Sequence, residues 1–198
     1  MSYIIVGLGN PGEEYTNTRH NTGRIVLEVI RTTYRFPDWE KSDKYKALVS
    51  EGKIKKEKVM LVEPETFMNK SGAAVKPLVT SKKKAESLLV IHDDLDIPIG
   101  SAKMSFNKSS GGHRGVESVI KAIKTEMFTR IRVGISPATL SGKLKKPRGE
   151  KAVEATILGE FKKSEMDALK KVLKKTTDVI FTLVTFGLEK AMSEFNRK

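Results

Sequence analysis

Three separate stretches of the chain carry side chains that together suit hydrolysis by an activated water molecule. Asn10 and His20 follow the first apolar run, Asn69 lies in a short polar segment, and Asp93 follows another apolar run. A carboxylate that accepts a hydrogen bond from one imidazole nitrogen leaves the other nitrogen free to take a proton from water. Asparagine amides hold a carbonyl or stabilise a developing oxyanion without changing charge. The set predicts cleavage of an ester or amide, and the base contributes about a hundred- to ten-thousand-fold in rate.

Each of these residues also has a structural explanation, and one neighbouring cluster raises a metal site as an alternative. Asn69 can be a turn residue, and Asp93 can cap the segment that follows it. His92, Asp93, Asp94 and Asp96 could contribute ligands, but in an extended chain Asp93 points away from the other three. A magnesium or zinc centre needs further well-placed ligands, and the sequence offers no other acidic cluster or histidine pair. We therefore expect no metal in the site.

Other catalytic motifs are incomplete or absent. The glycines Gly7, Gly9 and Gly12 match the spacing of a dinucleotide fingerprint, but a polar segment follows them in place of a close-packed helix. The acidic residue that this motif requires about 20 residues further on is also missing. No Gly-x-Ser-x-Gly elbow supports a serine nucleophile. The chain contains no cysteine, which excludes thiolate nucleophiles, disulfides and cysteine-based zinc sites.

Hydrophobic patterns predict the elements that position these side chains. Residues 3–8 and 88–91 are short apolar runs typical of buried strands. Each run ends in polar residues, and ligands bind at the carboxyl ends of strands in open α/β sheets. Further strands are predicted over 44–51, 58–62, 101–106 and 130–135. Helices are predicted over 24–34, 116–123 and 188–195. Two more helices are predicted from their caps: one begins after an N-cap at Ser71, and one runs from a capping box at Ser164 to Gly187. The alternation predicts one domain over residues 1–198, a three-layer α/β/α sandwich with a mixed, mostly parallel central sheet.

Composition indicates a globular protein with a polyanionic partner. The 198 residues are 38% hydrophobic and 31% charged, and they carry a net charge of +13. Such an excess is typical of a nucleic-acid or anionic-membrane partner, and scattered surface lysines can also serve solubility alone. Among these explanations the charge favours RNA or DNA as the partner. No apolar run reaches the roughly 20 residues of a membrane span, and the start of the chain lacks the features of a signal peptide. A cytoplasmic location and no membrane partner are expected.

A basic segment over residues 137–149 has two explanations. It contains Lys143, Lys145, Lys146 and Arg148 among glycine, proline and serine residues, which predicts a mobile loop. The loop either contacts an RNA backbone, which requires charge but little geometry, or is only solvated.

The order of the polar motifs resembles that of the bacterial-type peptidyl-tRNA hydrolases. The motifs are Gly-Leu-Gly-Asn-Pro-Gly from Gly7, Tyr15, Thr-Arg-His-Asn from Thr18, Phe-Met-Asn-x-Ser-Gly from Phe67, His-Asp-Asp-Leu-Asp from His92, and Gly-Gly-His from Gly111. They cover nearly the whole chain. The resemblance implies a single α/β domain with a mixed sheet, without cofactor or metal. It also implies an enzyme that cleaves the ester between a peptide and the tRNA 3′ end and so releases tRNA after stalled translation.

The resemblance also implies roles for individual residues. His20 would be the base that activates water, and Asp93 would orient and polarise this base. Asn10 and Asn69 would bind the peptidyl end and its carbonyl. Tyr15 would border the cleft near the 3′ end of the substrate. The substrate-binding set implied by the motifs is completed by Phe67, His113 and Arg114.

Two positions depart from the family pattern. Arg114 stands where the family usually has asparagine, and a donor-only guanidinium cannot replace an amide that also accepts. It could instead bind a phosphate at the start of the following helix. Arg132 matches one member of the basic pair that grips the tRNA 5′ phosphate, but Ser105 occupies the place of the other. Lys103 or Lys108 would then substitute, since phosphate accepts a point charge.

The sequence leaves two functions to compare. The first is hydrolysis of peptidyl-tRNA by a monomeric enzyme, without a covalent intermediate. The alternative is a non-catalytic RNA-binding protein on the same fold. Joint retention of His20, Asp93, Asn10 and Asn69 favours the enzyme, whereas Arg114 favours the alternative.

Overall fold

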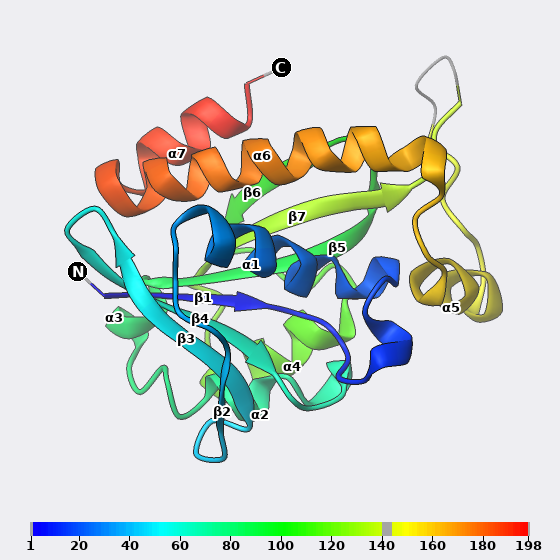
Figure 1. The fold of residues 1–198 in the computed structure, drawn as a ribbon. Helices are drawn as coiled ribbons and strands as arrows, with labels where there is room; N and C mark the ends of the chain where they lie inside the picture. The colour runs from blue at the N-terminus through cyan, green and yellow to red at the C-terminus, as the bar shows by residue number, and fades with distance from the viewer. Residues whose placement is uncertain (1, 140–143, 198) are drawn as a thin grey trace.

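One mixed sheet forms the centre of the molecule (Figure 1). The computed structural model describes residues 2–139 and 144–197. Within these residues the strands are β1 (Ser2–Gly7), β2 (Glu40–Ser42), β3 (Ala47–Ile54), β4 (Glu57–Pro64), β5 (Leu88–Pro98), β6 (Ala102–Phe106) and β7 (Thr129–Ser136). Their order is β2-β3-β4-β1-β5-β7-β6. The neighbouring strands β4, β1, β5 and β7 run parallel, while β3 and β6 pair with them in the antiparallel direction.

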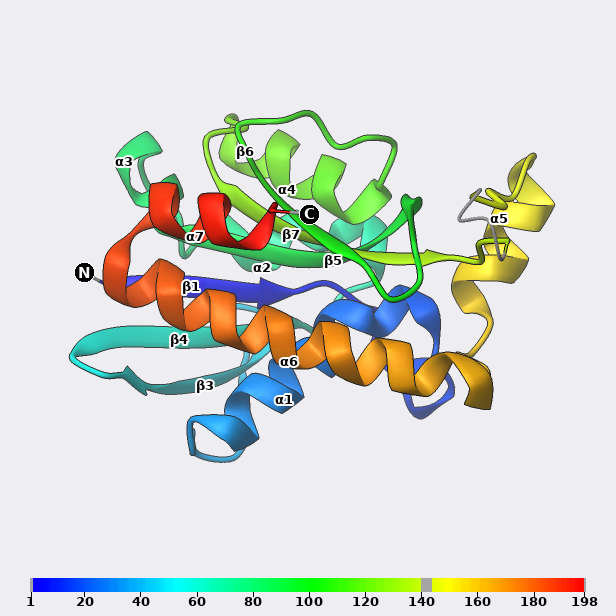
Figure 2. The ribbon, with the colours of Figure 1, turned by 90° about the horizontal axis from the view of Figure 1, so that it is seen from above.

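Helices cover both faces of this sheet (Figure 2). On one face lie α1 (Thr22–Thr33), α6 (Lys163–Phe186) and α7 (Leu188–Phe195), and on the other lie α2 (Gly72–Val75), α3 (Lys82–Ala85) and α4 (Arg114–Ile123). Three short 3₁₀ turns, η1 (Glu13–Tyr15), η2 (Arg19–Asn21) and η3 (Met68–Lys70), follow strand ends. The predicted three-layer α/β/α sandwich is confirmed.

The central strands bury both of their faces. Ile5 packs into the core beneath α1 and α6, while Ile4 and Val6 pack into the core beneath α4. Leu89 and Val90 of β5 divide between the two cores in the same way. Burial of one such side chain contributes about 1.5–3 kcal/mol. This two-sided burial explains why both strands are continuous apolar runs.

Strand β5 differs from its prediction because it continues through the polar residues. His92, Asp93 and Asp94 remain paired with β7, and the register shifts only between Asp94 and Pro98. The polar residues are therefore part of the sheet and do not follow it. Because successive strand residues point to opposite faces, Asp93 and Asp94 serve different surroundings.

Two predicted helix caps are wrong. Ser71 has helical backbone angles and its hydroxyl donates to the Met68 carbonyl at 2.8 Å, so its side chain does not cap α2. Helix α6 begins at Lys163, one residue before the predicted cap at Ser164. Its start is held by Glu165, whose carboxylate accepts the Lys162 N–H at 2.7 Å. A polar side chain near a helix start forms a cap only when the backbone is extended there.

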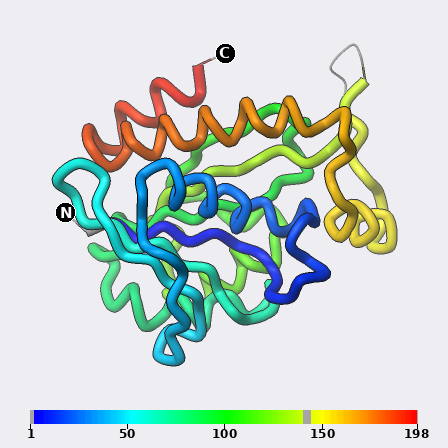
Figure 3. The backbone as a smooth tube through the Cα atoms, in the orientation of Figure 1, coloured from blue at the N-terminus to red at the C-terminus, as the bar shows by residue number. Residues whose placement is uncertain are grey.

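Helix α5 (Glu150–Leu158) is an element that the sequence patterns did not predict. None of its residues is buried, and it stands beyond the end of the sheet toward which β1 and β7 point (Figure 1). It lies beside the segment after β1, as the tube in Figure 3 shows, where Thr18 pairs with Glu160 and the Arg19 N–H donates to the Gly159 carbonyl at 2.9 Å. Chain segments about 140 residues apart thus form one end of the molecule.

Close contact between α1 and β1 requires two glycines. A Cβ on Gly7 would collide with the backbone of Gly23, and a Cβ on Gly23 would collide with the backbones of Leu8 and Ile91. The absence of both side chains lets the first turn of α1 approach β1 and β5. Among the described residues, no helix is long and apolar enough to cross a membrane.

Candidate active site

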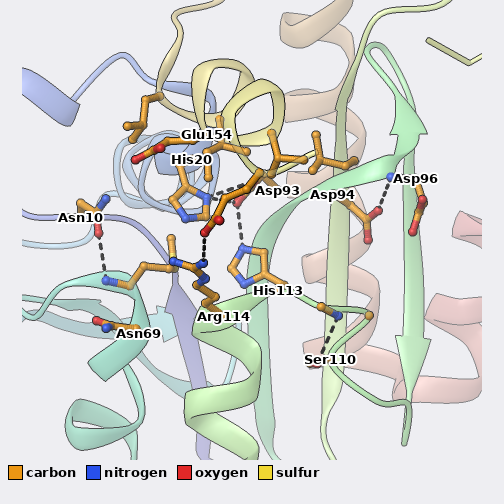
Figure 4. A pocket seen from close by; sticks show the side chains of 18 of the residues that line it. Asn10, His20, Asn69, Asp93, Asp94, Asp96, Ser110, His113, Arg114 and Glu154 are labelled. Carbon is orange, nitrogen blue, oxygen red and sulfur yellow. Dashed lines mark hydrogen bonds and ion pairs between the residues drawn. The ribbon is translucent and has the colours of Figure 1, made fainter. Parts of the chain in front are cut away.

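The three histidines of the chain gather around Asp93, and Figure 4 shows two of them, His20 and His113. His20 Nδ1 lies 3.0 and 3.1 Å from the two carboxylate oxygens of Asp93, and His113 Nε2 lies 2.9 Å from one of them. His92 Nδ1 lies 2.7 Å from the main-chain oxygen of Asp93. The His92 and His113 rings are 4.6 Å apart. One aspartate is therefore held at its carboxylate and at its backbone.

The hydrogen bonds determine which nitrogen of each imidazole carries the proton. The Val116 N–H donates to His113 Nδ1 at 3.2 Å, so His113 Nε2 carries a proton and donates to Asp93. Ionised Asp93 can only accept, which gives His20 its proton on Nδ1. Nε2 of neutral His20 is therefore a bare lone pair. This is the tautomer that a general base needs.

Burial and charge shift the titration of this centre in opposite directions. Burial raises the pKa of the Asp93 carboxyl, but His20 and His113 outweigh burial and hold the pKa well below its usual range. Burial lowers the pKa of His20, Asp93 raises it through charge and a hydrogen bond, and Arg114 lowers it. The net result is a raised pKa for His20. Burial and the neighbouring His113 lower the pKa of His92, which stays neutral.

Turn η2 positions His20 through the buried side chain of Arg19. Its guanidinium donates to the Ile135 carbonyl at 3.0 Å and to the Glu165 carboxylate at 2.8 Å. The Thr22 hydroxyl donates to the Arg19 carbonyl at 2.6 Å and closes the turn before α1. Arg19, the residue before His20, thus ties η2 to β7 and α6. A base held on rigid elements keeps its geometry during the reaction.

Asn10 is fixed on both its main chain and its side chain. The Asn10 N–H donates to Asn21 Oδ1 at 2.8 Å, and Asn21 Nδ2 donates to the Asn10 carbonyl at 2.9 Å. Its Oδ1 accepts the Met68 N–H at 2.9 Å. The amide orientation is therefore set, and the Nδ2 donors remain for a group in the cleft that Asn10 lines.

A cleft of about 430 Å³ opens above this centre. Its lining contains all eight residues that the sequence predicted for catalysis and substrate binding: Asn10, Tyr15, His20, Phe67, Asn69, Asp93, His113 and Arg114. Phe67 is 58% exposed, which is unusual for a large apolar side chain and typical of a binding surface. Asp93 and His20 lie at the buried floor, with 2% and 8% of their surfaces exposed.

The three cations predicted to bind tRNA phosphate lie outside the cleft, at the β6–β7 edge of the sheet. Lys103 is paired directly across from Arg132, so both side chains lie on the same face. Arg132 Nε donates to Asp94 at 2.6 Å. Lys108 is exposed in the loop after β6. Ser105 is buried opposite Arg130 and offers no exposed cation.

The basic loop lies only partly in the described part of the chain. Lys143 is outside the described residues, whereas Lys146 lines the cleft and forms an ion pair with Asp96. Lys145 and Arg148 are in the described part of the loop, and both are exposed.

The alternative metal cluster of the sequence is divided among other partners. His92 bonds the Asp93 carbonyl, Asp94 pairs with Arg132, and Asp96 pairs with Lys146. A different set, His20, Asp93 and His113, brings three possible ligand atoms within 4.8 Å of one another. In this set the two imidazole nitrogens already donate N–H groups to the carboxylate, so a metal ion would have to displace both protons.

The sequence patterns missed the wall that α5 contributes to the cleft. Val153, Glu154, Ile157 and Leu158 line it from one face of the helix. Their spacing three and four residues apart after Gly149 is the signal that would have predicted this helix. Asn21 was also missed as the partner that orients Asn10.

The fold and the site together define the class of protein. A mixed α/β sandwich carries an aspartate-oriented imidazole base on the floor of an open cleft, which is the arrangement of a hydrolase that activates water. The family model described as peptidyl-tRNA hydrolase matches residues 4–198. The chain belongs to this enzyme family.

Individual members of the family are similar in sequence to this chain over nearly its whole length. Peptidyl-tRNA hydrolase of Thermoanaerobacter sp. (strain X514) is 38% identical over 195 residues, covering 98% of this chain and 99% of the relative. That of Listeria welshimeri is 38% identical over 194 residues, with the same coverage. The crystal structure of peptidyl-tRNA hydrolase from Acinetobacter baumannii superposes with a TM-score of 0.86 at 30% identity, covering 98% of this chain and 94% of the other.

Proposed function

We propose that this chain hydrolyses the ester between a peptide, or an N-blocked aminoacyl group, and the 3′ end of tRNA. The observation that carries the proposal is the hydrogen bond from His20 Nδ1 to Asp93, which leaves His20 Nε2 bare at the floor of an open cleft. Membership in the peptidyl-tRNA hydrolases supports this choice of ester.

The reaction proceeds by direct attack of water. His20 Nε2 takes a proton from a water molecule, and the hydroxide forms a bond to the ester carbonyl carbon. Asn10 Nδ2 and the Asn69 amide donate to the carbonyl oxygen as it gains negative charge. The tetrahedral intermediate collapses by breaking the bond to the ribose oxygen, which receives the proton from the His20 imidazolium. A free carboxyl group and a free tRNA leave, and no covalent intermediate forms.

Asp93 acts on the base and not on the substrate. Its negative charge stabilises the imidazolium that forms when His20 takes the proton. The N–H of His113 holds the carboxylate at 2.9 Å, and the His92 ring holds the Asp93 carbonyl at 2.7 Å. His113, before α4, thus holds the Asp93 carboxylate, and the neighbouring His92 holds the Asp93 backbone, in position for His20.

The tRNA backbone binds at the β6–β7 edge. Lys103 and Arg132 lie side by side there, and Asp94 uses only the Nε of Arg132, so the terminal guanidinium nitrogens remain for a phosphate. Lys108 adds a cation that does not need defined geometry. A net charge of +13 raises the rate of encounter with RNA. The enzyme acts as a monomer in the cytoplasm and requires no metal.

Release of N-acetylaminoacyl product from acylated tRNA, in the presence of a chelator, tests the proposal. The unaltered chain should cleave, and His20→Ala should lose about a hundred- to ten-thousand-fold in kcat while it still binds tRNA. Glu189→Gln on α7 serves as a control for handling and folding, because Glu189 is exposed and lies outside the cleft. Tight tRNA binding without cleavage by the unaltered chain would favour the non-catalytic RNA-binding alternative. Cleavage that the chelator abolishes would replace the metal-free mechanism with a metal-dependent one.

A further inference from the structure

One of the acidic side chains that line the cleft stands apart from the others. Asp94 pairs with Arg132, Asp96 pairs with Lys146, and Glu150 pairs with Arg114 at 3.2 Å. Within residues 2–139 and 144–197, Glu154 has no hydrogen-bond or ion-pair partner. In Figure 4 it lies on the His20 side of the cleft, whereas Asp94 and Asp96 lie on the other side. Its carboxylate is therefore available to a group that enters the cleft.

The surface around Glu154 is apolar. Val153, Ile157 and Leu158 lie on the same face of α5 and line the cleft with it. No residue of α5 is fully buried, and Val153 and Ile157 are half-buried, so part of this apolar face stays open to the cleft. Leu158 is 38% exposed, and Phe67 of the cleft is 58% exposed. The wall offers apolar contact beside one carboxylate that is unpaired among the described residues, Glu154, while Glu150 at the start of α5 is paired with Arg114.

Charge decides which part of the substrate this wall accepts. A tRNA backbone carries one negative charge per phosphate and is repelled by Glu154, whereas Lys103 and Arg132 at the β6–β7 edge attract it. The two cations that line the cleft, Arg114 and Lys146, are paired with Glu150 and Asp96. A peptide has apolar side chains for Val153 and Ile157, and a lysine or arginine side chain complements Glu154. The α5 wall therefore suits the peptide and not the RNA.

We propose that Glu154 makes the enzyme select among peptidyl-tRNAs by the charge of the peptide, favouring a basic side chain near the ester over an acidic one. The inference rests on the proposed function. An exposed ion pair contributes about 0.2–1 kcal/mol, and a glutamate in the same place is repelled. The preference for lysine over glutamate is accordingly about two- to tenfold in kcat/KM.

Three substrates test the proposal: N-acetyl-X-alanyl-tRNA, in which X is lysine, glutamine or glutamate. The unaltered chain should cleave the lysine substrate about two- to tenfold faster in kcat/KM than the glutamate substrate at low ionic strength, with glutamine between them. Glu154→Gln should bring the ratio close to one, and Glu154→Lys should reverse it. Each ratio compares substrates on one protein, so a general loss of folded enzyme cancels.

Glu189→Gln is the matched control, since it makes the same change in net charge on α7, away from the cleft. It should keep the ratio of the unaltered chain. Equal cleavage of all three substrates by the unaltered chain, or a ratio that persists in Glu154→Gln, would overturn the inference and leave the proposed function intact. Cleavage of none of the three would instead contradict the proposed function.

Discussion

Two neighbouring residues of β5, Asp93 and Asp94, belong to two regions that differ in burial and in the partners of their charges. Asp93 points into the buried centre with His20 and His113, and Asp94 points to the other face and pairs with Arg132 at the basic edge. Asp93 is 2% exposed, whereas Lys103 of the basic edge is exposed. One strand thus contributes a carboxylate to each region because its side chains alternate.

This difference in burial indicates that, in the proposed reaction, the buried centre determines the rate and the basic edge determines tRNA binding. In the centre, little water screens the charges, so each hydrogen bond depends on position and has a strong effect on the transition state. At the edge, water and salt screen the charges, so binding depends on the number of cations more than on their exact positions. Changes in the centre should lower kcat, and changes at the edge should raise KM.

The largest effect is expected from Asp93→Asn. The amide removes the charge that stabilises the His20 imidazolium, and it can donate to His20 Nδ1 and so favour the wrong tautomer. We expect kcat to fall about a hundred- to ten-thousand-fold with tRNA binding retained. Because Asp93 raises the pKa of His20, the acid limb of any residual activity should move to lower pH.

Asp94→Asn is the matched variant, one residue along the same strand. It frees Arg132 from its carboxylate and should alter KM and its salt dependence, with kcat little affected. Single-turnover rates and tRNA binding measured for both variants compare the two regions directly. If Asp94→Asn lowered kcat as much as Asp93→Asn, the division between the regions would be wrong.

A smaller effect is expected from Lys103→Gln and Arg132→Gln. Each removes one phosphate contact, which should raise KM about three- to tenfold and reduce the slope of log KM against log salt by about 0.7–0.9. Lys41→Gln on β2, at the opposite edge of the sheet, is a control with the same loss of charge. KM measured between low and moderate salt gives the slopes. Equal slopes for all three variants would contradict a phosphate site at this edge.

Most of the proposed catalytic centre could be predicted from the sequence because its residues follow apolar strand runs. His20, Asn10 and Asp93 were expected near strand ends, and parallel strands bring such ends together. The family resemblance placed His113 only in the substrate-binding set, and its hydrogen bond to Asp93 was missed, since no local pattern connects the two across 20 positions. The tautomers depend on a backbone donor, Val116 N–H, which no side-chain pattern encodes.

The α5 wall could not be predicted by the same means. Its apolar residues face a cleft and not a core, so their pattern is short and mixed with glutamates. The extension of β5 was missed because pairing with β7 stabilises polar residues that favour a loop by composition. In both places, contacts between distant segments outweigh the local pattern.

The smallest expected effect links the two regions through Arg114. This exposed residue pairs with Glu150 and lowers the pKa of His20 through its charge. His20 must be neutral to act as a base, so kcat/KM should fall at low pH with a midpoint above the ordinary imidazole value of about 6.5. In Arg114→Asn the lowering influence is lost, and the acid limb should move to still higher pH.

Glu150→Gln distinguishes the effect of the Arg114 charge from the effect of losing the Arg114–Glu150 ion pair. It removes the carboxylate charge of the ion pair but keeps the guanidinium, so the acid limb should not move to higher pH as it does in Arg114→Asn. The pH profiles of kcat/KM for the unaltered chain and both variants provide the comparison. An acid limb that stays in place in Arg114→Asn would mean that solvent screens the exposed guanidinium from the buried base, and that the two regions are electrostatically independent.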